Sequence, residues 1–74
     1  MKPQRREHHG SVIEITEREG RFELRIDGEL HRFGQLPSGK YFLHDYAYDW
    51  HDSLMEVAVR YVEHRERAAR AGDK

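Results

Sequence analysis

Cysteine is absent from the 74 residues of this chain, and proline occurs only twice. Without cysteine the protein has no disulfide bond and no thiolate metal ligand, so packing, self-association or a partner must stabilise it. No apolar run approaches the length of a membrane span or of the hydrophobic part of a signal peptide. These absences predict a soluble, cytoplasmic protein that does not act at a membrane.

A strong charge of either sign is also missing. Thirteen Lys and Arg residues stand against fourteen Asp and Glu residues, which gives a formal net charge of −1 at pH 7. The two signs are mixed along the chain, so the sequence lacks the continuous basic region that is typical of nucleic-acid-binding proteins. Length and composition therefore predict one small domain with a core of about a dozen residues.

A long amphipathic helix is predicted over residues 49–69. Its apolar residues recur at helical spacing and share one side: Trp50, Leu54, Val57, Ala58, Tyr61 and Val62. Asp49 is the predicted N-cap. Several arginines near the end of this segment suit the negative end of the helix dipole, and Gly72 is expected to end the helix.

Three strands are predicted before this helix from the alternation of apolar and polar residues. They cover residues 11–17, 21–27 and 30–33, and residues 41–44 could form a fourth. The turns after the first two strands are expected to be three-residue loops. At Asp27-Gly28, a two-residue loop would place Glu29 opposite Ile26, on the core side of the sheet.

These elements predict an α+β fold, in which a three-stranded, or four-stranded, antiparallel β-meander packs on one C-terminal α-helix. The single domain would span residues 11–72. Residues 1–10 are polar and lack periodicity, and we expect them to form a disordered arm. The expected core consists of Ile13, Ile15, Phe22, Leu24, Ile26, Leu30, Phe33, Leu43, Trp50, Leu54, Val57, Ala58, Tyr61 and Val62.

Histidine and carboxylate residues next to each other raise the question of a metal site. His44-Asp45 and His51-Asp52 lie close in the sequence, with Asp49 between them. Imidazole and carboxylate groups are ligands for zinc, iron and manganese. Adjacent residues diverge by about 100° around a helix, however, so the second pair would not converge on one ion. We expect neither a metal nor a cofactor here.

Catalysis is not indicated by any other group of residues. The chain has no cysteine nucleophile and no phosphate-binding loop, and its three serines have no base at a fixed spacing. His8 and His9 fall on the expected disordered arm. They could capture a metal loosely, but adjacent histidines on a flexible arm are far more often exposed and without function. The sequence therefore predicts a protein that is not an enzyme.

Apolar surface in excess of what one sheet can cover is the remaining feature. Met55 and Val59 lie beside the main apolar side of the helix, whereas a helix packed on a single sheet needs only one stripe. Aromatic residues cluster before the helix, and Tyr and Trp are frequent at interfaces. The sequence predicts a non-catalytic protein–protein interaction module that forms a homodimer or docks on a larger protein. The predicted binding residues are Tyr41, Phe42, Tyr46, Tyr48, Met55 and Val59.

Nucleic-acid binding is the alternative function. Arg21 and Arg25 lie on the polar face of the predicted sheet, with Arg18 and Arg32 nearby. Basic residues on a three-stranded sheet followed by a helix resemble the arm-binding domains of tyrosine recombinases, although only this order of elements is similar. The resemblance implies DNA contact through the arginine-bearing face, but cross-strand pairing with glutamates explains the same charges. A third alternative is a small antagonist that blocks a site on another protein.

Overall fold

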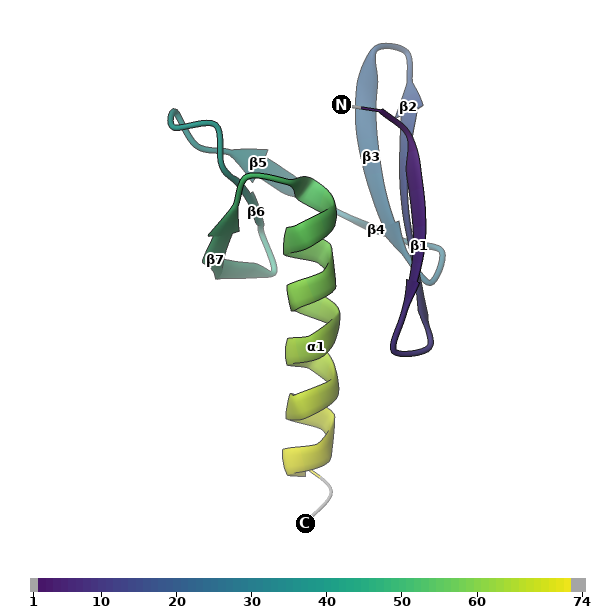
Figure 1. Ribbon diagram of the computed structural model, residues 1–74, viewed down its shortest axis with the longest axis vertical. Helices are drawn as coiled ribbons and strands as arrows, with labels where there is room; N and C mark the ends of the chain where they lie inside the picture. The colour runs from purple at the N-terminus through teal and green to yellow at the C-terminus, as the bar shows by residue number, and fades with distance from the viewer. Residues whose placement is uncertain (1, 73–74) are drawn as a thin grey trace.

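The structure of the protein is a computed structural model that describes residues 2–72 (Figure 1). Within this range seven strands precede one helix. Their bounds are β1 Gln4–His8, β2 Ser11–Arg18, β3 Arg21–Ile26, β4 Glu29–His31, β5 Phe33–Gln35, β6 Tyr41–Leu43, β7 Tyr46–His51 and α1 Leu54–Gly72.

The strands form two antiparallel sheets, one on each side of α1 (Figure 1). The four-stranded sheet is a meander with the order β1-β2-β3-β4, and the three-stranded sheet has the order β5-β6-β7. Only Arg32 separates β4 from β5, so the chain passes from one sheet to the other over a single residue. The predicted α+β class, with a β-meander and a C-terminal helix, is confirmed.

The N-terminal segment is a strand, so the prediction of a disordered arm at residues 1–10 is wrong for Gln4–His8. This segment pairs with β2 in a register that runs from Gln4↔Ile15 to His8↔Ser11. The pairing satisfies backbone groups of β2 that would otherwise be open at a sheet edge. Side-chain periodicity gives no sign of it, because every residue from Gln4 to Glu7 is exposed.

The three hairpins of the four-stranded sheet have two-residue turns, so the predicted three-residue loops are wrong. In each turn a non-glycine residue and the following glycine both have positive φ, as in type I′ turns: His9 52° and Gly10 81°, Glu19 53° and Gly20 77°, and Asp27 54° and Gly28 81°. The twist of type I′ turns matches the twist of paired strands, which explains the preference for them.

The last of these turns determines which residue of β4 faces the core. Ile26 pairs with Glu29, and Leu24 pairs with His31. His31 therefore points inward and is 5% exposed, whereas Leu30 points outward and is 55% exposed. The prediction of Leu30 as a core residue is wrong because the register is shifted by one residue.

The helix begins later than predicted. Residues 49–51 belong to β7, which pairs with β6, and α1 begins at Leu54. The cap is Ser53, whose hydroxyl accepts a hydrogen bond from the Glu56 N–H at 3.4 Å, rather than Asp49. Trp50 was predicted in the core but is 53% exposed on this strand. Within residues 2–72, no helix is both long and apolar enough to cross a membrane.

The core lies between α1 and the two sheets. The helix contacts β1 and β2 on one side and β6 and β7 on the other. The buried apolar residues are Ile13, Ile15, Leu24, Ile26, Leu43, Leu54, Met55, Val57, Ala58 and Val62. Phe22, Phe33 and Tyr61, also predicted in the core, are partly buried against this cluster.

Asp27 joins the turn between β3 and β4 to two other parts of the chain. Its carboxylate accepts a hydrogen bond from the Val12 N–H at 2.9 Å and pairs with Arg65 of α1 at 3.3 Å. The same arginine reaches the hydroxyl of Ser11 at 3.4 Å. The hydrogen bond from Val12 is the main reason why the pKa of the Asp27 carboxyl lies below its ordinary value.

The two-residue turn between β2 and β3 can be tested with two substitutions. Gly20→Ala should destabilise the protein by about 1–2 kcal/mol, and this loss is due to the positive φ alone because a Cβ would meet no atom within 4 Å. Glu19→Asn should stabilise the protein because asparagine tolerates positive φ. Urea unfolding measures both changes. If Glu19→Asn brings no gain, the turn is the three-residue loop, in which this residue has negative φ.

The lowered pKa of Asp27 predicts how Asp27→Asn changes the dependence of stability on pH. The stabilisation by the carboxylate is complete above the ordinary pKa of about 4 and is lost as pH falls through the lower folded value. The free-energy difference between the wild type and Asp27→Asn should therefore be constant near neutral pH and shift in favour of the variant in acid. Urea unfolding from pH 7 to pH 2 measures it. A difference that stays constant over this pH range would contradict the prediction.

Candidate functional site

The predicted apolar flank of the helix is not a surface. Met55 is only 8% exposed, and Val59 packs against the core. Met55, Val59 and Glu63 recur at a spacing of four residues and so lie on one side of the helix, and Glu63 contacts His8 of β1. The four-stranded sheet therefore covers this flank. The expected exposure of Met55 is wrong because the helix packs on two sheets rather than one, and Val59 is partly buried.

The predicted aromatic cluster divides between two faces of the three-stranded sheet. Tyr41 and Tyr46 pack against the core, and Tyr46 lies 4.5 Å from the ring of His64. Phe42 lies on the opposite face, because side chains alternate along a strand. Its ring stacks on His44 at 5.8 Å. The side chain of Tyr48 lies outside the described part of the structure.

Phe42 also covers the backbone of Gly34 on the neighbouring strand β5. A Cβ on this glycine would lie 2.6 Å from Cζ of the phenylalanine ring, so the close approach requires glycine. Of the predicted binding residues whose side chains are described, Phe42 is the one on the outer face of this sheet.

A groove lies beside the short strand β4, where the two sheets meet. Its volume is about 320 Å³. Aromatic and aliphatic side chains form much of its wall, and polar residues complete it: Phe22, Glu23, Leu30, His31, Arg32, Phe33 and His44. A mainly apolar groove with a few polar groups is typical of a binding site. Its position was not predicted, because Leu30 and Phe33 had been placed in the core.

The groove lies along an open edge of β3. Strand β4 ends at His31, which pairs with Leu24, while β3 extends back to Arg21. Residues 21–23 of β3 pair with β2 on one side and have no strand on the other within the described chain. In the alternating pattern of an antiparallel ladder, Phe22 is the residue whose N–H and C=O point to this open side. An added strand could form hydrogen bonds here.

His31 is the buried polar residue of the groove wall. Its Nδ1 lies 3.2 Å from Oδ2 of Asp45, and its ring lies 5.3 Å from the ring of Tyr61. With Nδ1–H donating to the carboxylate, Nε2 is an acceptor. No partner for Nε2 occurs among the residues that the structure describes. A buried polar atom without a partner is unusual in folded proteins.

The rim of the groove carries an unpaired positive charge. Glu23 is paired with Arg25 at 2.7 Å, whereas no ion pair of Arg32 occurs within residues 2–72. The groove is therefore best suited to a ligand that combines apolar side chains with a carboxylate.

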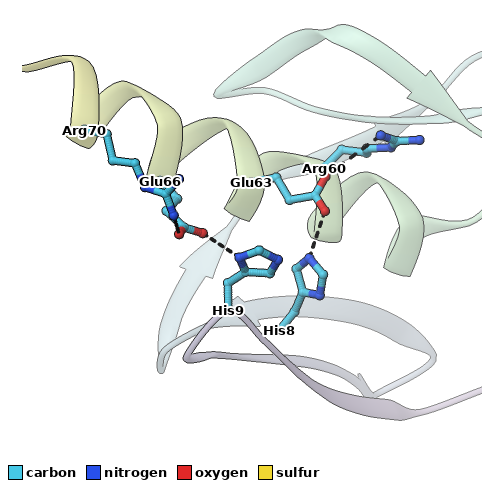
Figure 2. Close-up of polar contacts among 6 residues, drawn as sticks. All are labelled: His8, His9, Arg60, Glu63, Glu66 and Arg70. Atoms are coloured by element: carbon cyan, nitrogen blue, oxygen red, sulfur yellow. Dashed lines mark hydrogen bonds and ion pairs between the residues drawn. The ribbon is translucent and has the colours of Figure 1, made fainter.

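A second polar group joins the turn between β1 and β2 to α1 (Figure 2). His8 Nε2 lies 3.0 Å from Oε2 of Glu63, and His9 Nδ1 lies 2.7 Å from Oε2 of Glu66. The hydrogen bond with His8 is the main reason why the pKa of the Glu63 carboxyl is lowered. The prediction of a disordered arm is wrong at these histidines, because β1 and its turn place them against the helix: His8 is partly buried, whereas His9 stays exposed, as predicted. The dipeptide His9-Gly10 is the hairpin signal that could have located them.

The histidine–aspartate pairs considered from the sequence do not form one group. Asp45 pairs with His31, and Asp52 pairs with Lys40 at 3.6 Å. His51 lies between Asp49 at 2.9 Å and Glu56 at 3.2 Å. These partners lie in different parts of the fold, so the pairs serve separate local contacts.

Comparison with known proteins gives no functional assignment: no family model matches the chain, and no curated protein matches it. The inference of function therefore depends on the groove and on the two polar groups described above.

The unpaired Nε2 predicts that His31→Leu is tolerated. An unsatisfied buried polar atom costs about 1–3 kcal/mol, and Asp45, which loses its partner, is 63% exposed at its side chain. The free energy of unfolding should stay within about 1 kcal/mol of the wild type or rise. Thermal and urea unfolding measure it, with Leu24→Ala as a control that should lose about 2–5 kcal/mol. A comparable loss in His31→Leu would contradict the prediction.

Proposed function

We propose that the protein is a non-catalytic interaction module that binds an extended segment of another protein in the groove beside β4. The observation that carries this proposal is the meeting of an open strand edge, an exposed Leu30 and the rings of Phe22 and Phe33 in one groove. The proposal keeps the function class predicted from the sequence, a protein–protein interaction module. It replaces the predicted surface of aromatic residues and helix flank by the groove. The cytoplasmic location expected from the sequence is part of the same proposal.

The open edge of β3 favours a strand as the bound form. A segment that continues the line of β4 would add to the sheet at Phe22 and so extend the existing antiparallel ladder. Its backbone would supply hydrogen bonds, and alternate side chains would enter the groove. Phe22, Leu30 and Phe33 line the space into which those side chains would go.

The charges favour a segment with apolar and acidic residues. Arg32 is available for a carboxylate, since it has no ion pair among the described residues. Arginine binds carboxylates in a planar, bidentate geometry. A lysine-rich segment would instead meet this unpaired positive charge. The proposed partner is therefore an acidic, apolar stretch that is extended when bound.

Binding without catalysis is the proposed activity. None of the serine residues lines the groove, and the two histidines of its wall are bonded to Asp45 and stacked on Phe42 respectively. A nucleophile next to a base is the usual arrangement for covalent catalysis. The groove residues fit recognition better than chemistry.

Nucleic-acid binding through the outer face of the four-stranded sheet has weaker support. Arg25 pairs with Glu23 at 2.7 Å, and Arg5 pairs with Glu7 at 3.6 Å. These glutamates lie beside the arginines on the same strands and would repel phosphates. A protein segment is favoured because the groove offers apolar side chains as well as charge.

Selection from a displayed library of random octapeptides tests the proposal. Peptides that alternate apolar and acidic residues should be enriched, and Leu30→Asp should weaken binding of an enriched peptide at least about tenfold, equivalent to about 1.4 kcal/mol. Arg32→Glu should weaken acidic peptides and favour basic ones. Titrations followed by NMR would measure the dissociation constants and locate the shifted resonances.

Trp50→Asp is the matched control, because Trp50 is 53% exposed, like Leu30 at 55%, but does not line the groove. Loss of peptide binding in the control and not in Leu30→Asp would contradict the proposal. Salt-sensitive binding of labelled oligonucleotides that is lost in Arg25→Glu would favour the alternative. A dimer mass in sedimentation that disappears in Leu30→Asp would replace the partner protein by a second copy of this chain.

A further inference from the structure

We propose that His8, His9 and Glu63 form a binding site for one divalent transition-metal ion of the zinc type. One potential ligand atom from each of these residues lies within 4.8 Å of the other two. The two histidines come from the end of β1 and the turn after it, and the glutamate comes from α1 (Figure 2). The site is separate from the groove beside β4, which shares none of these residues.

The geometry requires only small side-chain movements. His8 Nε2 and Glu63 Oε2 are already 3.0 Å apart, close to the separation of two ligands on one zinc ion at bond lengths of about 2.0–2.2 Å. The ring nitrogen of His9 that does not face Glu66 points towards His8 and Glu63 (Figure 2). A modest rotation of the His9 ring would bring its nitrogen to the ion.

Glu66 would act as the supporting carboxylate. It lies 2.7 Å from Nδ1 of His9 and also bonds to Arg70. In metal sites the ring nitrogen that does not bind the ion is usually held by a carboxylate, which fixes the orientation of the ring. This contact would leave Nε2 of His9 for the metal.

The donor set selects the class of ion. Two imidazoles and one carboxylate suit zinc and the neighbouring divalent ions cobalt, nickel and copper, whereas calcium and magnesium prefer oxygen ligands alone. His8 and Glu63 are 55 positions apart in the chain. A bound ion would therefore link the N-terminal hairpin to the C-terminal helix in a protein without disulfide bonds.

His9→Asn is a sharp test because the turn suits asparagine. His9 has a φ of 52°, and asparagine followed by glycine is a preferred type I′ sequence. The variant should remain folded while it loses one imidazole. Glu63→Gln removes the helix ligand with almost no change in size. His64→Asn makes the same chemical change at an exposed histidine of α1 outside the site.

Calorimetric titration with Zn²⁺, checked by competition with a chromogenic chelator, would measure affinity and stoichiometry. The full chain should bind one ion, and Co²⁺ should give the visible absorption of a low-coordinate site. His9→Asn and Glu63→Gln should each weaken binding at least about 100-fold, since loss of supporting residues alone costs about 10–100-fold. His64→Asn should bind as the wild type does, and Zn²⁺ should raise the melting temperature of the wild type and of this control.

Several results would overturn the proposal. They are a stoichiometry above one, equal weakening in His9→Asn and His64→Asn, or unchanged affinity in Glu63→Gln. Each would show adventitious binding to scattered histidines. Circular dichroism of every variant confirms that a loss of affinity is not a loss of fold.

Discussion

A single helix must bury the apolar faces of two separate sheets, and the rest of the structure depends on this constraint. Each sheet alone would leave an open apolar face, and the described chain has no second helix to cover it. Helix α1 therefore carries apolar residues around more than one side. Leu54 and Val57 are buried together with Met55, although a helix on one sheet would have left the last of these exposed. The apolar surface of α1, which exceeds what one sheet can cover, matches what two sheets need.

The short turns determine how the four-stranded sheet meets this helix. A two-residue type I′ turn sets the register of its two strands, and a shift by one residue exchanges the two faces. The turn at Asp27-Gly28 therefore turns His31 inward and Leu30 outward. Strand β4 ends after three residues, where the chain passes to the other sheet, and so leaves the edge of β3 open. The exposed leucine and the buried histidine of the groove wall therefore have one common cause, the register that the turn sets.

Local patterns in the sequence predicted the elements whose own residues define them. Strands β2 and β3 alternate strictly, and most of α1 follows helical spacing, so both were predicted. Strand β1 was missed because its residues are polar and it is defined by pairing with β2. The predicted start of the helix is too early because Trp50 fits the helical spacing. The pairing of β7 with β6, which places this residue in a strand instead, is a nonlocal contact. Met55 was expected at the surface for the same reason, since it is covered by a sheet that does not adjoin it in the sequence.

The two proposed sites act on the same part of the fold. Tyr61 contacts His31 of the groove wall, and Glu63, two residues later in α1, contacts His8. Two parts of the four-stranded sheet, β4 and the N-terminal hairpin, therefore contact the same stretch of the helix. A ligand that binds only the folded chain stabilises it by a free energy that grows with the logarithm of its concentration over its dissociation constant. A chain of this size buries a limited fraction of its surface, so it gains proportionally more from such a ligand than a larger domain does.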